Sequence, residues 1–236
     1  MNNELVFLFQ TIIGLFFTLA TFKMGKSWLL AYIGVCIVLA NIFVTKQINL
    51  FGLAATGGNV VYGSVFLATD LLNEHYGKEE AKKAVYIGFS MALFFTLMSQ
   101  MILLFEASSD DWGASDGMIN IFTSTPNIIF ASLIAYLLSQ LHDIWAFHAI
   151  RVKTSGGFLW LRNNLSTCLS QAIDSIVFAS LAFLIIPILF VNGNVLPVST
   201  VLEIVLSTYL LKIIVAIIDT PFIYLSYSFK PVKAVI

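Results

Sequence analysis

Long apolar runs separated by short polar segments dominate the pattern of this chain. Each run reaches or exceeds the roughly 18 residues that an α-helix needs to cross the hydrocarbon core of a bilayer. None shows the alternating ten-residue segments that are typical of a membrane β-barrel. The pattern therefore predicts an all-α, polytopic helical membrane protein, in which residues 1–236 form a single domain. The predicted runs cover residues 4–22, 27–45, 58–75, 84–105, 127–150, 160–190 and 200–226.

The third run decides whether six or seven helices cross the membrane, because it is short and ends in polar residues. Before it, residues 46–59 are expected to form a glycine-bearing connection with weak helix signals. After it, residues 77–83 are expected to form a charged turn and the start of the next helix. Residues 106–125 are acidic and polar, and residues 151–157 are expected to form a basic loop.

Composition agrees with this prediction, because the chain is 59% hydrophobic and only 11% charged. A soluble domain carries about a quarter charged residues. The net charge of −1 offers no basic surface for nucleic acid. His142 and His148 are six positions apart, on different faces of a helix, so we expect no metal site and no cofactor. The sequence also lacks the usual hydrolase and protease motifs, and we expect no enzyme.

Basic residues fall in alternate loops, which gives an orientation by the positive-inside rule. The loops on the opposite side hold a single basic residue, Lys46, and Lys212 lies within a run. With seven helices, the N-terminus is expected outside and the C-terminus in the cytoplasm of a bacterial or archaeal cell, in the inner membrane. The residues assigned to the cytoplasmic side are Lys23, Lys26, Lys78, Lys82, Lys83, Arg151, Lys153, Arg162, Lys230 and Lys233.

A polar stripe runs far into the sixth predicted helix. It consists of Asn163, Thr167, Ser170, Gln171 and Asp174, whose spacing places them on one helix face. Asp174 lies about 20 Å along the helix from its start, well inside a hydrocarbon core of about 30 Å. A carboxylate at that depth costs at least ~2.5 kcal/mol, so it is expected to face a bundle interior or a wet cavity. The stripe predicts a central polar site for a small solute.

The fifth and sixth predicted helices share the pattern Ser-Gln-x-x-Asp. It occurs at residues 139–143, with Gln140 and Asp143, and again at residues 170–174. Gln and Asp three positions apart share a helix face. Because the two helices are predicted to be antiparallel, this short match is compatible with an inverted repeat, a common arrangement in transporters. The alternative is that two unrelated helices use a similar polar face.

Carboxylate and amide groups together suit the N–H and amino edge of a planar heterocycle. We therefore interpret Asp174 with Gln171 as the main candidate pair, against the alternative of a polar clamp between helices. Gln140 and Asp143 are a second pair. Asp70 and Glu74 are candidates for the site or for a gate, although a solvated helix end also explains Glu74. The further candidates for substrate binding are Asn163, Asn164 and Ser170.

Other charged or polar residues within the runs are candidates for a gate or for ion coupling. Lys212 and Asp219 are seven positions apart on one helix, close enough for an intramembrane ion pair, and the alternative is that Asp219 handles a proton. Asn41 and Lys46 could line a pathway from the outer side. Arg162 lies at the start of the sixth helix, where Asn163 and Asn164 could form a cytoplasmic mouth or simply cap the helix.

Three segments resemble the queuosine precursor transporter family, also called vitamin uptake transporters. They are TDLLNEHYGKEEAKK (69–83), SLIAYLLSQLHD (132–143) and WLRNNLSTCLSQAIDSIVF (160–178), and the resemblance extends from about Ala40 to Asp219. It implies a six- or seven-helix inner-membrane protein that imports 7-cyano-7-deazaguanine or its 7-aminomethyl relative for tRNA modification. By the same resemblance, Asp70, Glu74, Asn163, Asn164 and the two Gln–Asp pairs are the positions expected to meet the base.

Two other readings stay open at this point. The chain could be the substrate-binding membrane subunit of an ATP-driven uptake system, or a membrane scaffold or enzyme with an unknown substrate. In the favoured reading, the partners are a deazapurine substrate and membrane lipid, with no nucleic acid, and a homodimer is one open arrangement.

Overall fold

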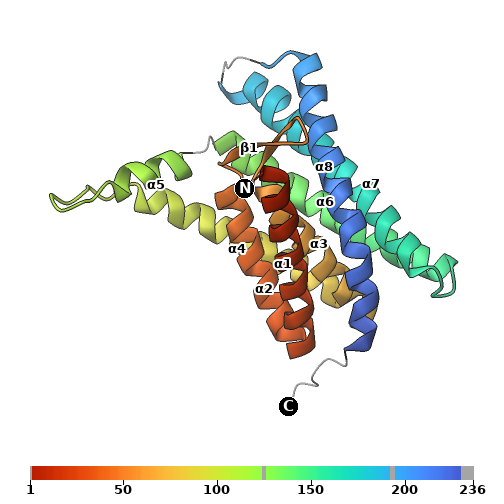
Figure 1. The fold of residues 1–236 in the computed structure, drawn as a ribbon. Helices are drawn as coiled ribbons and strands as arrows, with labels where there is room; N and C mark the ends of the chain where they lie inside the picture. The colour runs from red at the N-terminus through yellow and green to blue at the C-terminus, as the bar shows by residue number, and fades with distance from the viewer. Residues whose placement is uncertain (1, 124–125, 192–194, 230–236) are drawn as a thin grey trace.

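The computed structural model describes residues 2–123, 126–191 and 195–229, and nearly all of its regular structure is helical (Figure 1). Two short strands and several single turns complete the elements. The helices are α1 (Asn3–Met24), α2 (Lys26–Phe43), α3 (Gly58–His75), α4 (Lys78–Ile102), α5 (Ala114–Phe122), α6 (Pro126–Lys153), α7 (Leu159–Ser180) and α8 (Val198–Leu225). The strands are β1 (Gln47–Leu50) and β2 (Leu53–Thr56), and a 3₁₀ turn, η3 (Ser226–Ser228), follows α8.

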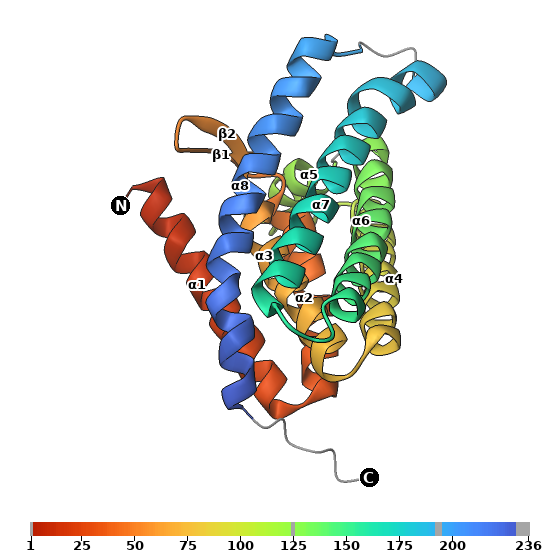
Figure 2. The same ribbon diagram turned by 90° about the vertical axis from the view of Figure 1, so that its right-hand side faces the viewer.

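Helix α3 occupies the centre of the bundle. It packs against α1, α2, α4, α6 and α8, and 16 of its 18 residues are buried. Figures 1 and 2 show it running between the end of the bundle that carries the hairpin and the end where α1 and α8 finish. The prediction of a third helix over 58–75 is confirmed. Helix α3 is too polar to count among the six helices of the described residues that are long and apolar enough to cross a membrane.

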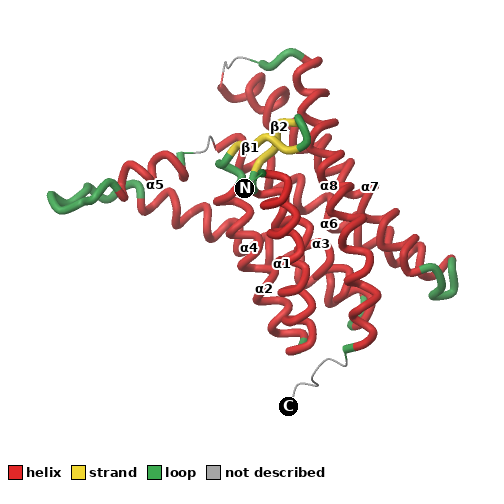
Figure 3. The backbone as a smooth tube through the Cα atoms, in the orientation of Figure 1, coloured by secondary structure: helices red, strands yellow, loops and turns green. Residues whose placement is uncertain are grey.

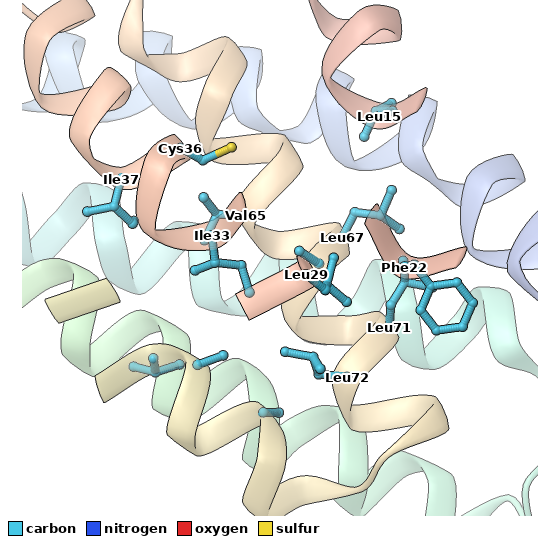
Figure 4. Packing of buried hydrophobic residues seen from close by; sticks show 14 of the residues in the cluster. Leu15, Phe22, Leu29, Ile33, Cys36, Ile37, Val65, Leu67, Leu71 and Leu72 are labelled. Carbon is cyan, nitrogen blue, oxygen red and sulfur yellow. The ribbon is translucent and has the colours of Figure 1, made fainter. Parts of the chain in front are cut away.

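The largest apolar cluster surrounds α3 and also draws residues from α1, α2, α4, α6, α7 and α8. Leu29, Ile33 and Ile37, one helical turn apart on α2, face Val65 and Leu72 of α3. Figure 4 shows these side chains interdigitating, with Phe22 closing one end of the cluster. The outward faces of the long helices are apolar as well, as a lipid environment requires. The prediction of an all-α, multi-pass membrane protein is confirmed.

Two segments between the long helices contain structure that the sequence pattern did not predict. Residues 47–56 form an antiparallel hairpin, whose turn at Phe51 and Gly52 has positive φ at both positions. Glu4 and Asn3 of α1 hydrogen-bond to its backbone, so the hairpin is tied to the start of the chain. The acidic segment 106–125 contains the short helix α5, which extends with the end of α4 away from the bundle (Figures 1 and 3).

The predicted helix over 160–190 is regular only to Ser180. Beyond it the chain forms two π-helical turns, Leu181–Ile185 and Pro187–Val191. Pro187 has no backbone N–H to donate within a regular helix, and this explains the change in winding. The predicted connection after residue 190 lies partly outside the described residues.

Gly63 lets α3 approach α8 closely. A Cβ atom at this position would lie 2.1 Å from Cγ1 of Val215, which is a stiff, β-branched side chain. We expect Gly63→Ala to lower the stability of the purified protein by about 1–3 kcal/mol through overpacking, measured by thermal unfolding in detergent. Gly117→Ala on α5, where nothing lies within 4 Å, is the matched control. Addition of Val215→Ala should recover the loss, and no recovery would contradict the stated contact.

Candidate functional site

Buried polar side chains gather where α3, α6, α7 and α8 meet. Burying so many polar groups in a membrane bundle is costly unless they bond to each other or to a ligand. The whole predicted stripe of α7 points into this region, and none of its members is more than 7% exposed. The cluster comprises Thr69, Asp70, Asn73 and Glu74 of α3, Ser139, Gln140 and Asp143 of α6, Arg162, Asn163, Ser166, Thr167, Ser170, Gln171 and Asp174 of α7, and Lys212 and Asp219 of α8.

Asp174 is already neutralised by the protein. Its Oδ2 accepts a short hydrogen bond from Nζ of Lys212, and its Oδ1 accepts one from the Ser139 hydroxyl at 3.2 Å. The expected ion pair between Lys212 and Asp219 is therefore wrong. Both residues lie on the inner face of α8, but Lys212 reaches across to α7, because the Asp174 carboxylate faces it there.

Asp219 is held by an amide and keeps a free oxygen. Its Oδ1 accepts a hydrogen bond from Nδ2 of Asn163 at 2.8 Å, while its Oδ2 is buried without a partner among the described residues. One residue along α7, Nδ2 of Asn164 bonds the hydroxyl of Thr220 at 2.8 Å. Asn163 is fully buried, so it belongs to the interior cluster and does not form an open mouth.

A narrow crevice, too tight in this conformation to admit a water molecule, lies between α3, α7 and α8. It begins beside Asn59 in the first turn of α3 and reaches Asp219 in the last third of α8. Along α7 it meets Thr167 and Gln171, and Phe66 of α3 offers it an aromatic ring. The remaining lining residues are Gly63, Lys212, Val215 and Ala216. The Gln171 Oε1 and Thr167 Oγ1 atoms are buried without partners in the described part of the chain, so this crevice presents unused polar groups.

Asp70 and Asp143 form a carboxyl pair between α3 and α6. Both are fully buried, and their side chains interact with each other. Ser166, Thr167 and Ser170 of α7 lie beside Asp143. None of the four carboxyl oxygens has a hydrogen bond of ordinary geometry within the described residues. Gln140, on the same face of α6, accepts a hydrogen bond from Thr69 at 3.2 Å.

The repeated Ser-Gln-x-x-Asp pattern makes reciprocal contacts. Ser139 of α6 donates to Asp174 of α7, and Ser170 of α7 lies beside Asp143 of α6. Such an exchange is what a local two-fold relation between two antiparallel helices produces. Ser170 also lies 2.9 Å from Nδ1 of His142. A repeat that extends beyond this helix pair stays a prediction.

A second network closes the end of the cluster at which α3 finishes and α7 begins. Arg162 forms a bidentate ion pair with Glu74, at 3.0 Å from Nε and 2.8 Å from an amino nitrogen. The Tyr227 hydroxyl donates to the same carboxylate at 2.5 Å. Arg162 also bonds the carbonyls of Gly156 and Gly157, which ties the α6–α7 loop to α3. Glu74 is 7% exposed, so the alternative of a solvated helix end is wrong.

Two predicted gate residues lie away from this cluster. Lys46 is exposed in the turn that precedes β1. Asn41 bonds to the carbonyl of Ile37 and lines a separate pocket, to which residues of α2 to α7 contribute. That pocket is lined mainly by apolar side chains, with Tyr62, Thr96 and Ser132 among the exceptions. A role for Asn41 or Lys46 in a pathway stays a prediction.

Several residues in or beside the cluster were missed by sequence reasoning. Asn59 and Phe66 belong to a run that reads as ordinary apolar helix, and Thr69 was noted only inside a longer motif. Tyr227 follows the last predicted helix and reads as an interface aromatic residue. No spacing signal links Tyr227 to Glu74, because they are 153 positions apart. Within the described residues, no group of His, Cys, Asp and Glu could hold a metal ion.

Comparison with known proteins identifies the relatives of this bundle. The model of the family described as "Putative vitamin uptake transporter" matches residues 56–226, from the end of β2 through η3's first residue. The chain belongs to this family. The matched region contains all of α3, α6, α7 and α8, and hence every member of the polar cluster. A family of transporters gives no support to an enzymatic reading.

Three curated relatives carry closely similar names. A Bacillus subtilis (strain 168) protein named "Probable queuosine precursor transporter" is 40% identical over 98% of this chain and 97% of its own length. The "Queuosine precursor transporter" of Escherichia coli (strain K12) is 28% identical over 81% of this chain and 80% of its own. A Haemophilus influenzae relative is 27% identical over 57% of this chain and 54% of its own length. No solved structure gives a significant match.

Proposed function

We propose that this protein imports queuosine precursors, the 7-deazaguanine bases 7-cyano-7-deazaguanine and 7-aminomethyl-7-deazaguanine, for tRNA modification. The observation that carries the proposal is the near full-length similarity to a relative named for that transport. The polar crevice inside a membrane bundle adds independent physical support, because a transporter needs a site for its solute near the middle of the membrane.

The hydrogen-bonding edge of the base complements the polar groups that line the crevice, which must widen to admit it. A guanine-like ring offers an N–H and an amino group as donors beside a carbonyl acceptor. The free Oδ2 of Asp219 and Oε1 of Gln171 are acceptors for those donors, and the Thr167 hydroxyl can donate to the carbonyl. Phe66 supplies a ring on which the base can stack. In this proposal Asp219, rather than Asp174, is the carboxylate that meets the base, since Asp174 is occupied by Lys212.

The remaining contacts suggest how the two sides of the membrane are separated. The crevice starts near the end of the bundle that carries the hairpin, whereas the Glu74–Arg162 network seals the opposite end. That sealed end carries Lys23, Lys26, Lys78 and Arg151, so by the positive-inside rule we assign it to the cytoplasm. Import then requires the Glu74–Arg162 network to open after the base has bound.

A growth-independent uptake assay tests the proposal. Bacteria that cannot synthesise the deazaguanine precursor, and that lack their own transporter, are given the gene and a precursor in the medium. We expect queuosine to reappear in their tRNA, measured by mass spectrometry of tRNA nucleosides. No queuosine, with the protein present in the membrane at normal abundance, would overturn the proposal.

Reconstitution separates autonomous transport from an ATP-driven system. We expect the purified chain alone to exchange labelled precursor across liposome membranes. Exchange that appears only after an ATP-hydrolysing partner is added would instead identify a substrate-binding subunit. Conversion of the base to a new compound would identify an enzyme.

A further inference from the structure

We propose that Asp70 and Asp143 form a proton-binding site that couples import of the base to the entry of a proton. The proposal rests on the transport function proposed above and names what drives it. It comes from the distribution of charge in the bundle interior and from the contacts of these two side chains.

The interior contains more carboxylates than cations. Five buried acidic side chains face the polar cluster: Asp70, Glu74, Asp143, Asp174 and Asp219. Only two buried cations accompany them in the described residues. Arg162 pairs with Glu74, and Lys212 pairs with Asp174. Asp70, Asp143 and Asp219 are left without a cation, and isolated carboxylate charges are strongly unfavourable in a low-dielectric interior.

Two of these three carboxyl groups lie close enough to interact. Like charges in contact cannot both persist in a region without water, so a carboxyl pair of this kind holds a shared proton. Asp70 and Asp143 are both fully buried and interact directly, which meets this condition. Asp219 differs, because the Asn163 amide stabilises one of its oxygens and its other oxygen borders the crevice.

Unused donors point to the same pair. The Ser166 and Thr167 hydroxyls of α7 are buried without partners in the described part of the chain, and both lie beside Asp143. They can donate hydrogen bonds to the Asp143 carboxylate when the proton leaves, so the structure can stabilise the ionised state of the pair. Thr167 also lines the crevice, and it therefore links the base site to the carboxyl pair.

Other charged groups near the pair are few and have defined partners. From α8, Asp219 acts on Asp70, and from α3 itself, Glu74 does so. On α7, Cys168 is close enough to interact electrostatically with Asp143 and Asp219, and Arg162 forms an ion pair with Glu74. On α6, His142 bonds to Ser170. Each of these groups either carries negative charge, is neutral or is already paired, so a proton is the available counter-charge.

The cycle that follows transfers one proton with each base. A proton from the outer side binds the carboxyl pair while the base occupies the crevice. When the Glu74–Arg162 network opens, the base and the proton leave to the cytoplasm, and the pair returns ready for the next proton. Asp70 is one helical turn from Glu74 on α3, so the proton's exit and the opening of the network use the same helix.

The test uses the purified full-length protein in liposomes that contain a trapped pH-sensitive dye. The substrate is 7-cyano-7-deazaguanine, which is neutral and therefore carries no charge of its own. Addition of the base outside should acidify the interior, and an inside-alkaline gradient should increase accumulation at least tenfold over that without a gradient. A protonophore should abolish both effects. Base uptake without proton movement would overturn the proton-coupling inference while leaving the proposed function intact.

Variants test the assignment to the carboxyl pair. Asp143→Asn and Asp70→Asn are each expected to exchange labelled base across the membrane but to lose gradient-driven accumulation and proton entry. Asp116→Asn, at an exposed position on α5, should keep both. Proton entry that persists in either variant would overturn the assignment. If neither variant folds, the infrared absorption of protonated carboxyl groups in the unmodified protein decides it, because base release should remove that band.

The same experiment distinguishes the two proposals. If the unmodified protein neither takes up nor exchanges the base, the proposed function fails together with its coupling. If exchange occurs at equal rates in all gradients, only the coupling fails.

Discussion

Replacement of Asp219 by asparagine is expected to weaken uptake of the base by about tenfold to a hundredfold, with little loss of stability. The asparagine side chain has nearly the same shape, so the helix packing and one hydrogen bond with Asn163 can persist. What disappears is an acceptor oxygen in the crevice, because the asparagine amide offers a donor in its place. Leaving one partner of a buried hydrogen bond unsatisfied costs about 1–3 kcal/mol, and each 1.4 kcal/mol corresponds to a factor of ten. Binding of a labelled precursor to the purified protein gives the measurement.

Asp174→Asn is the informative comparison for this prediction. It leaves the Lys212 ammonium without its carboxylate, so it should lower the unfolding temperature as well as uptake. Asp116→Asn controls for the general effect of removing one carboxylate. Unchanged affinity in Asp219→Asn, together with lost affinity in a folded Asp174→Asn protein, would return the base-binding role to Asp174.

Replacement of Arg162 by methionine is expected to destabilise the protein by about 3–5 kcal/mol. The change leaves the Glu74 carboxylate buried with only the Tyr227 hydroxyl and the more distant Arg151 near it. It also frees the carbonyls of Gly156 and Gly157, so the α6–α7 loop loses its attachment to α3. Thermal unfolding in detergent, followed by tryptophan fluorescence, measures the loss.

The double variant Arg162→Met with Glu74→Met should recover much of this stability, because it removes the uncompensated charge. Lys82→Met is the matched control, since Lys82 pairs with Glu79 at 3.0 Å on the surface. An exposed pair of that kind contributes only ~0–1 kcal/mol. Equal losses in Arg162→Met and Lys82→Met would contradict the view that burial makes the Glu74 pair important.

The faces of the helices could be predicted from the sequence because helical periodicity is a local property. Asn163, Thr167, Ser170, Gln171 and Asp174 all lie on one buried face, as their spacing indicated. The central helix over 58–75 was predicted at its observed limits, because Gly58 and the Tyr76–Gly77 pair mark its ends. Gly77 has φ of 92°, which a glycine adopts without strain in the short reversal into α4.

Partners across the bundle could not be predicted in the same way. Lys212 and Asp219 share a helix face, but a lysine side chain can extend toward any neighbouring helix. Its choice of Asp174 depends on how α7 and α8 pack, and spacing along one helix carries no such information. The Glu74–Arg162 pair likewise joins residues 88 positions apart.

Short elements of secondary structure also could not be predicted from the sequence. The hairpin at residues 47–56 and helix α5 are each too short for a clear periodic signal. Both depend on contacts made elsewhere, such as the Gln100 amide that bonds the carbonyl of Phe122 at the end of α5.

The polarity of α3 has a consequence for how the protein reaches the membrane. The insertion machinery sorts segments largely by their own hydrophobicity, and α3 carries Asp70, Asn73 and Glu74 near one end. The groups that bond Asn73 and Glu74 come from α6 and α7, which leave the ribosome later. During synthesis, α3 is therefore expected to insert stably only late, because its insertion depends on helices that have not yet been made. The half-chain that ends after α4 is then a membrane-bound intermediate in which α3, the central helix of the final bundle, has not yet reached its final position.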